Sequence, residues 1–271
     1  MADKEMSFWE HLDDLRGVLL RMGATVAIAA VALFCVMPRI FDRIILAPCH
    51  DSFPLYRLFD IITAAWTGSE QAKPWSMELI NTQLASQFFI HISASCQLAV
   101  ALTFPLLLYQ LWTFISPALY PDERRHSARA FVAGNALFYT GVATGYFLVF
   151  PLTLRFLAGY QLSGLITNTI TIDSYMDNLT SILLVMGIVF EIPVMAWFLG
   201  RAGLMDRSFF NRFRRHAVVA LTVAAAVITP TSDPFTLAVV FVPLYMLWEA
   251  SALVVPAAAK RNAKSVADAM L

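Results

Sequence analysis

Long apolar runs alternate with short polar stretches along this chain of 271 residues. A helix rises about 1.5 Å per residue, so roughly 20 apolar residues are needed to cross about 30 Å of hydrocarbon. Most of the runs have about that length, and two shorter ones follow near the C-terminus. The pattern predicts an all-α membrane protein with six transmembrane helices, over residues 17–37, 88–114, 130–150, 179–200, 216–229 and 234–250.

The last two runs, 216–229 and 234–250, are short for a membrane crossing. The first of them would rise only about 21 Å as a helix, so the bilayer must thin around it if it crosses. A buried hairpin, as in a soluble protein, is the alternative. The polar turn 229–234 between the two runs favours a tight extracytoplasmic turn.

Polar segments precede and follow the first span. Residues 7–16 predict an amphipathic helix on the membrane surface, which begins with a capping box made by Ser7 and Glu10. Pro38 should end the first span, because proline cannot donate a helical hydrogen bond. Residues 38–87 are then expected to form an extracytoplasmic cap.

Other prolines and short apolar stretches set further expectations. Two stretches of the cap, 40–47 and 56–66, have helical spacing but are too short to cross the bilayer. Pro105 predicts a kink in the second span. Pro151 should end the third span, and residues 152–177 should form a polar loop before the fourth.

Basic side chains gather near both ends of the chain and in alternate connectors. Lys and Arg accumulate on the cytoplasmic side of membrane proteins, so we expect both termini to be cytoplasmic. The residues on this side are Lys4, Arg16, Arg124, Arg125, Arg129, Arg201, Arg207, Arg212, Arg214, Arg215, Lys260, Arg261 and Lys264, and those on the other are Arg39, Arg43, Arg57, Lys73 and Arg155.

Composition agrees with a membrane protein and disfavours other classes. Hydrophobic residues make up 59% of the chain and charged residues 14%, with a mean hydropathy of +0.66, whereas about a quarter of the residues in a soluble domain are charged. A net charge of +0 gives no case for a nucleic-acid partner. The acidic N-terminus differs from the basic start of a cleavable signal peptide, so the first span should be retained.

Sequence motifs for catalysis or metal binding are missing. The cysteines at positions 35, 49 and 96 are too few and too scattered for a disulfide framework or a metal site. The sequence has no H-E-x-x-H motif, no Gly-rich phosphate loop and no nucleophile elbow. We therefore expect no enzyme activity, no metal and no cofactor.

Two acidic features fall on the predicted cytoplasmic face. Asp13 and Asp14 lie before the first span, and a second acidic pair, which ends in Glu123, lies between the second and third spans. Carboxylates backed by aromatic side chains such as Phe114 and Tyr120 can accept bidentate hydrogen bonds from guanidinium groups. A ligand that presents arginines would fit this face.

A structural role is the alternative for each of these acids. Asp13 would pair with Arg16 three residues further on. Asp122 would cap a helix that begins at Glu123, and Glu123 would pair with one of the arginines that follow it. Sequence spacing alone leaves these alternatives open.

Further polar groups lie in or beside the apolar runs. A carboxylate inside a span is costly, by about 2.5–3.5 kcal/mol for a central Asp on insertion scales, so Glu191 should face a protein interior or a wet cavity. Glu249 is expected to be a solvated interface residue, and Asp233 to cap the last helix or bind a partner. Gln110 and His91 are interpreted as internal hydrogen-bonding groups.

Four stretches match a known membrane-protein family in type and order. They are residues 11–16 (HLDDLR), residues 109–120 (YQLWTFISPALY) with Glu123-Arg124-Arg125, residues 190–194 (FEIPV), and Thr229-Pro230 with Asp233. On these residues the chain resembles TatC, the multi-spanning receptor subunit of the twin-arginine protein translocase. The match extends over nearly the whole chain.

The resemblance implies a six-helix, glove-shaped receptor for folded export substrates with twin-arginine signal peptides. Asp14 and Glu123 match the acidic residues that contact the arginine pair. Glu191 matches an intramembrane acid that contacts a polar residue of a pore-forming partner. The implied signal-binding residues are Asp14, Glu123, Phe114, Arg16 and Tyr120, and the implied partner-binding or intramembrane polar residues are Glu191, Gln110 and Asp233.

The resemblance also implies partners and a location. The partners would be twin-arginine signal peptides, single-span proteins like TatA and TatB, and further copies of the chain, in the inner membrane of a prokaryote, with export driven by the proton-motive force. Asp14 departs from the family pattern, which usually has Glu there, and segment 38–87 is longer than expected. The alternative is a proton-coupled small-solute transporter centred on Glu191, although the sequence shows no convincing internal repeat.

Overall fold

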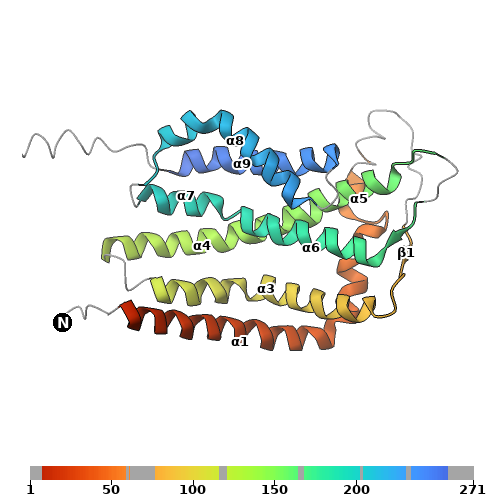
Figure 1. The fold of residues 1–271 in the computed structure, drawn as a ribbon, viewed down its shortest axis with the longest axis horizontal. Helices are drawn as coiled ribbons and strands as arrows, with labels where there is room; N and C mark the ends of the chain where they lie inside the picture. Colours follow the sequence, from red (N-terminus) through yellow and green to blue (C-terminus); the bar gives the residue numbers. More distant parts are fainter. Residues whose placement is uncertain are drawn as a thin grey trace, which may run out of the picture. The chain divides into compact units, whose positions relative to one another are not determined.

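The computed structural model describes residues 8–58, 61, 77–115, 121–163, 168–201, 204–229 and 233–255, and for residues 8–11, 115 and 121–129 it describes the backbone alone. The described residues are mostly helical (Figure 1). The chain divides into two compact units. Unit 1 comprises residues 1–136 and 161–180, and unit 2 comprises residues 137–160 and 181–271.

Five helical segments in the described ranges are long and apolar enough to cross a membrane. This finding agrees with the predicted all-α membrane protein, whereas the count of six crossings stays a prediction. The five segments are Leu12–Cys49, Ser86–Phe114, Ala130–Gly159, Ile172–Arg201 and Pro234–Val254.

Two long helices, α1 (Phe8–Ile40) and α3 (Ser86–Ile115), pack against each other and run in opposite directions in unit 1 (Figure 1). Helix α1 is continuous from Phe8, so no break separates the predicted surface helix 7–16 from the predicted first span, and the residue at which the span begins stays a prediction. Residue 7, with its predicted cap, lies outside the described part of the chain.

The predicted end of the first span at Pro38 is also wrong, because α1 continues to Ile40. Proline has no N–H, so it cannot bond to the carbonyl of Phe34 four residues earlier. That carbonyl instead accepts a hydrogen bond from Nε2 of His91 on α3, at 2.9 Å. Because the carbonyl finds a partner across the helix pair, the helix can pass through the proline.

Beyond α1 the chain folds into a cap of short elements, which replaces the helix predicted over 40–47. A π-helical turn η1 (Phe41–Ile45) leads into a 3-10 turn η2 (Ala47–Cys49). The buried hydroxyl of Tyr56 donates to the carbonyl of Pro48 at 3.1 Å. Tyr175 in turn donates to the carbonyl of Ile45, so the cap is fastened to α6 (Ile172–Val189).

Two further contacts join segments far apart in the sequence at this end of unit 1. Strand β1 (Leu79–Ile80) pairs in parallel with β2 (Ile170–Thr171). Ser86, at the beginning of α3, donates to the carboxylate of Asp173 in the first turn of α6. Asp173 therefore belongs to a helix, and not to the loop predicted over 152–177.

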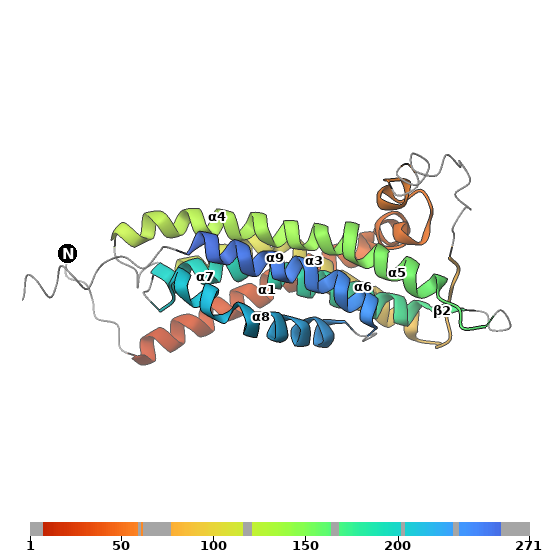
Figure 2. The same ribbon diagram turned by 90° about the horizontal axis from the view of Figure 1, so that it is seen from above.

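The third predicted span also continues past its expected end. Helix α4 (Pro121–Thr144) leads into the π-helical segment η4 (Gly145–Val149) and then α5 (Phe150–Gly159), and Figure 2 shows them as one rod. Pro151 lies in the first turn of α5. Proline is tolerated in a first turn because its missing N–H would have had no helical partner there, so Pro151 does not end the segment.

In unit 2, α9 (Pro234–Val254) packs against α8 (Arg207–Ile228), α7 (Ile192–Arg201) and α5. Helices α8 and α9 have 22 and 21 residues, a rise of about 32 Å each. Because α8 is not among the five segments that are apolar enough to cross a membrane, the short fifth crossing stays a prediction. Helix α8 begins at Arg207 and includes the basic connector that the sequence pattern placed outside the membrane.

Close packing within unit 2 depends on two glycines. A Cβ atom added to Gly141 on α4 would lie 2.5 Å from the carbonyl oxygen of Met186 and 2.8 Å from the Cβ of Phe190. A Cβ atom on Gly187 of α6 would lie 2.7 Å from the ring of Phe138. The two helices can approach this closely because both positions lack a side chain.

Candidate functional site

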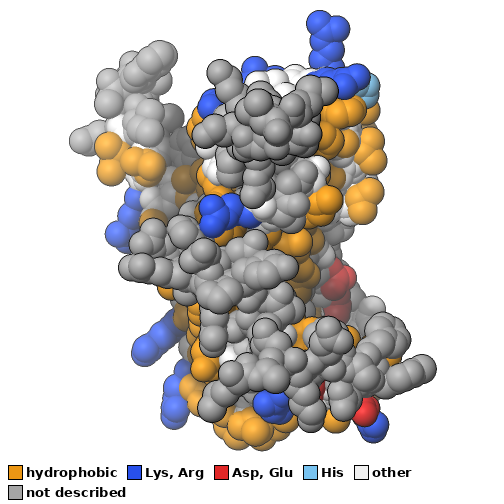
Figure 3. All heavy atoms as spheres, turned by 90° about the vertical axis from the view of Figure 1, so that its left-hand side faces the viewer, with side chains coloured by type: hydrophobic (Ala, Val, Ile, Leu, Met, Phe, Trp, Pro, Cys, Tyr) orange, Lys and Arg blue, Asp and Glu red, His pale blue; other side chains and the backbone are white. Residues whose placement is uncertain are grey.

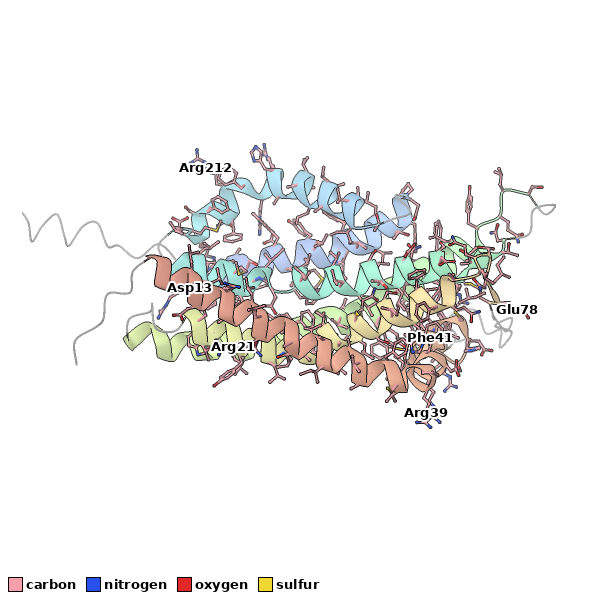
Figure 4. The ribbon with its side chains drawn as sticks, turned by 60° about the horizontal axis from the view of Figure 1, so that its bottom comes forward. Asp13, Arg21, Arg39, Phe41, Glu78 and Arg212 are labelled. Atoms are coloured by element: carbon pink, nitrogen blue, oxygen red, sulfur yellow. The ribbon has the colours of Figure 1, made fainter. Side chains whose placement is uncertain are left out.

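The predicted acidic residues of the N-terminal motif lie in the first turns of α1. Asp13 and Asp14 are exposed, as is Arg16, and Figure 4 shows Asp13 at the beginning of the helix. The alternative in which Asp13 pairs with Arg16 is contradicted, since the described residues contain one ion pair, which lies elsewhere.

The other half of the predicted site lies between α3 and α4. Phe114 is half-buried in the last turn of α3, and Tyr120 lies outside the described residues. Helix α4 begins at Pro121, so Asp122 is not the cap of a helix that begins at Glu123. The backbone of Glu123 lies in the first turn of α4, and its side chain is outside the description.

Unit 1 brings these two halves to the same end. Because α1 and α3 are antiparallel, the first residues of α1 and the last residues of α3 lie at the same end of unit 1. Helix α4 also begins at that end (Figures 1 and 2). Asp14, Phe114 and the backbone of Glu123 are therefore at one end of this unit.

Glu191 lies at a break in the fourth predicted span. Helix α6 ends at Val189 and α7 begins at Ile192, with a turn at Phe190 and Glu191 between them. Pro193 explains the break, since it cannot donate to the carbonyl of Val189.

The carboxylate of Glu191 is half-buried, and its Oε1 atom is buried without a hydrogen-bond partner among the described residues. A buried polar atom that has no partner is costly. The Oε1 atom of Glu191 at this helix break can therefore accept a hydrogen bond from a donor that the described residues do not supply.

The other predicted polar residues have internal partners. Nε2 of Gln110 donates to the hydroxyl of Thr25 on α1 at 3.0 Å, so its interpretation as an internal hydrogen-bonding group is confirmed, as it is for His91. Oδ1 of Asp233 accepts from the backbone N–H of Thr236 at 2.8 Å and caps α9. The structural alternative for Asp233 is therefore correct.

Glu249 was expected to be solvated and is instead paired. Its carboxylate forms an ion pair with Arg214, which joins α9 to α8 within unit 2. Sequence reasoning missed this pair because the two residues are 35 positions apart. It also missed the glycine contacts around Gly141 and Gly187, for which small residues inside an apolar run were the available signal.

A metal centre is not formed by the described residues, which contain no group of three or more His, Cys, Asp or Glu side chains that could hold an ion. The three cysteines are free, and Cys49 is the buried one. What the described residues offer is an acidic helix end in unit 1 and an unpartnered carboxylate in a helix break.

These features define a class, the helical membrane proteins that cross the bilayer several times and keep polar groups at helix ends and helix breaks. A family model described as Sec-independent protein translocase protein (TatC) matches residues 10–243. The chain belongs to the TatC family.

Individual relatives agree with this assignment. The chain is 32% identical over 250 residues to TatC of Blattabacterium sp. subsp. Periplaneta americana, over 91% of this chain and 94% of that protein. It is 31% identical over 243 residues to TatC of Deinococcus radiodurans, over 89% of this chain and 82% of that protein. A crystal structure of the "Twin Arginine Translocase Receptor- TatC in DDM" has a TM-score of 0.73 and 29% identity, over 91% of this chain and 99% of that one.

Membership of the family confirms the resemblance predicted from the sequence motifs. The chain is a component of the Sec-independent, twin-arginine protein translocase. The alternative of a small-solute transporter centred on Glu191 finds no support in these relatives.

Proposed function

We propose that this TatC family member receives twin-arginine signal peptides at the end of unit 1 where α1 begins. The observation that supports this most directly is the common location of the first turns of α1, the last turn of α3 and the first turn of α4 (Figure 1). A solved relative is named a twin-arginine translocase receptor, and this chain keeps the acidic motifs of its family at that end.

The ligand's arginine pair would bind carboxylates there. Asp14 is exposed and Phe114 is half-buried close to the chain segment that leads to Glu123. An arginine guanidinium donates two parallel hydrogen bonds to a carboxylate, and such charge-assisted bonds are stronger than neutral ones. Arg16 and Tyr120 complete the proposed set, with Arg16 turned to solvent beside the acids.

The topology that suits this function has six crossings and both termini in the cytoplasm of a prokaryote, in its inner membrane. Under this topology, α8 crosses as the fifth helix although its first turns are basic. The signal-binding end then faces the compartment in which cargo proteins fold. The distribution of Lys and Arg supports this orientation.

Glu191 would serve a second partner. Its Oε1 atom is buried without a partner in the described residues, and the helix break exposes part of the side chain. A polar residue of a single-span protein of the TatA or TatB type would satisfy this acceptor inside the membrane. The chain would then act as a receptor and assembly platform without being an enzyme.

The test is photo-crosslinking of a twin-arginine precursor to the full-length protein in membranes. Glu123→Ala should abolish the crosslink, and Asp14→Ala should weaken it more than Asp13→Ala does. Glu78 supplies the matched control, because it is an exposed carboxylate at the opposite end of unit 1 (Figure 4). Normal crosslinking and export with Glu123→Ala would overturn the proposal.

A further inference from the structure

Four threonines in the long helices satisfy their hydroxyl groups in the same way. Each hydroxyl donates to the backbone carbonyl four residues earlier in its own helix, a common arrangement for threonine in a helix. The four residues are Thr25, Thr103, Thr144 and Thr222. A threonine in a helix therefore needs no partner from another helix as long as that carbonyl is within reach.

Thr153 on α5 and Thr236 on α9 do not follow this arrangement. They are 2% and 1% exposed, and their Oγ1 atoms are buried without a hydrogen-bond partner among the described residues. The backbone before each residue explains why. The residue four positions before Thr153 ends the π-helical segment η4, in which bonds run to the fifth residue and not the fourth. The residue four positions before Thr236 precedes α9, which begins at Pro234.

Both threonines lie where α9 packs against α5 in unit 2. The rings of Phe156 and Phe235 stack across this contact, with centroids 4.1 Å apart. Helix α9 also contacts η4, which precedes α5, so α9 and α5 run in opposite directions. Thr153 lies almost one turn before Phe156, and Thr236 directly follows Phe235. In antiparallel helices these two positions are on the same side of the ring pair, toward η4.

A partner for these hydroxyls is not available from outside the helix bundle. The outer side of α9 exposes Val242, Met246 and Leu253, and hydrophobic side chains also lie along the flanks visible in Figure 3. The hydrocarbon core that surrounds such side chains offers no hydrogen bonds. A buried polar group without a partner is costly, and proteins commonly satisfy such groups with an ordered water.

We propose that one water molecule is bound between α5 and α9, where it bridges the hydroxyl groups of Thr153 and Thr236. A hydroxyl can both donate and accept, so the water accepts a hydrogen bond from one threonine and donates one to the other. The two Oγ1 atoms are not hydrogen-bonded to each other, and a water spans the longer separation. The stacked rings of Phe156 and Phe235 lie between this site and the end of α5.

The bridge gives the first turn of α9 a polar attachment to a second helix. Asp233 caps that turn from within its own chain segment, through the N–H of Thr236. The water and the ring stack instead hold the turn against α5. Because the site uses residues of unit 2 alone, it is independent of the signal-binding end proposed in unit 1.

A double-mutant cycle tests the bridge in the full-length protein in detergent. Thr→Val keeps the volume of the side chain and removes the hydroxyl. Thr153→Val and Thr236→Val should each lower the thermal unfolding temperature by roughly 2–4 °C, because the other hydroxyl loses its bridged partner. The double variant should lose less than the sum of the two, because it leaves no hydroxyl to satisfy. Thr153→Ser keeps the hydroxyl and should keep the wild-type unfolding temperature more closely than Thr153→Val does.

Thr103 supplies the matched control. It is a buried threonine of unit 1 whose hydroxyl donates to the carbonyl of Ala99 in its own helix. The effects of Thr103→Val and Thr153→Val should therefore add, since the two residues share no partner.

A high-resolution crystal structure gives the direct readout. The wild-type protein should show density for one water between the two Oγ1 atoms, and the double valine variant should lack it. Two results would overturn the proposal. One is the absence of that density in the wild-type protein. The other is a rise of the unfolding temperature in both single variants with additive effects, since hydroxyls that have no partner at all are better replaced by methyl groups.

Discussion

The imidazole of His91 on α3 donates from Nε2 to the backbone carbonyl of Phe34 on α1 at 2.9 Å. The His91 ring also stacks on the Phe34 ring, with centroids 3.8 Å apart. The carbonyl is the one that Pro38 leaves without a helical donor. A side chain on the neighbouring helix therefore compensates for a backbone defect in α1.

This relationship predicts a coupling between His91 and Pro38. His91→Phe keeps an aromatic ring but removes the donor, and should lower the free energy of unfolding by about 1–2 kcal/mol because a partly buried carbonyl loses its partner. In a Pro38→Ala background the N–H of residue 38 can bond to that carbonyl. The cost of His91→Phe should then shrink, by at least about 0.5 kcal/mol.

A double-mutant cycle of thermal or denaturant unfolding in detergent measures this coupling. Tyr109→Phe is a suitable control, because Tyr109 is an exposed residue of the same helix. Equal costs of His91→Phe in both backgrounds would contradict the coupling between His91 and Pro38.

A second prediction concerns the glycine contacts of unit 2. Gly141→Ala places a methyl group 2.5 Å from the carbonyl oxygen of Met186, and such overpacking costs about 1–3 kcal/mol. Gly23 on α1 has no atom within 4 Å of an added Cβ, and Gly→Ala in an open helix stabilises by up to about 1 kcal/mol. Unfolding measurements should therefore give opposite signs for the two substitutions, and equal signs would contradict the packing described for Gly141.

The ion pair between Arg214 and Glu249 leads to a third prediction. Glu249→Gln should lower the thermal unfolding temperature, because α8 and α9 lose the charged contact that joins them. Arg212→Gln is the matched control on the same helix and should leave that temperature nearly unchanged. Exchange of the two charges, with Arg214→Glu and Glu249→Arg, should restore part of the loss, and absence of any restoration would mean that the pair is not formed.

A fourth prediction concerns pH and the beginning of α8. Asp206 accepts hydrogen bonds from the hydroxyl of Ser208 at 2.7 Å and from the N–H of Phe209 at 2.9 Å. These bonds hold the pKa of Asp206 below its ordinary value. Their stabilisation is fully present above the pKa of an unfolded Asp, about 3.9, and is lost as the pH falls through the lower pKa of the folded protein.

Amide hydrogen exchange at Phe209 tests this expectation. Protection of that amide should decrease below about pH 4 as the carboxylate becomes protonated. Asp206→Asn keeps an acceptor oxygen but cannot titrate, so the difference in protection between the two proteins should depend on pH. A constant difference across this range would exclude titration of the cap.

The last prediction separates the proposed roles of two acids. Glu191→Ala should leave crosslinking of a twin-arginine precursor largely intact and should reduce assembly with single-span partners of the translocase, because only the latter would use the carboxylate in the helix break. Co-purification of these partners measures the effect. Loss of precursor binding together with normal assembly would contradict this division of roles.

Prolines show why helix bounds could be predicted only in part. The patterns at Pro38, Pro151 and Pro193 looked alike in sequence, since each ends or interrupts an apolar run. The helix passes Pro38 because His91 supplies a donor, and it passes Pro151 because a π-helical segment brings that proline into a first turn. Of these three prolines, only Pro193 lies beside a break between two helices.

The candidate site, like the helix bounds, could be predicted from the sequence only in part. The distribution of Lys and Arg and the family resemblance placed Asp14 and Glu123 in one functional group, and the antiparallel packing of α1 and α3 brings their chain segments to one end of unit 1. The pairing of Glu249 was missed, because an ion pair between two helices leaves no periodic signal in either one. Helix α8 begins at Arg207, nine residues before the predicted fifth span, since helix formation does not stop where arginines begin.

The sequence by itself determined the class and the family of this protein. Both depend on properties that reside in short stretches, namely the length of apolar runs, the sign of the connectors and the order of motifs. The tertiary structure decided which of three neighbouring arginines is paired, which proline breaks its helix and which glycine cannot be replaced. Each of these depends on an atom from another helix, and the identity of that atom is set only when the helices pack.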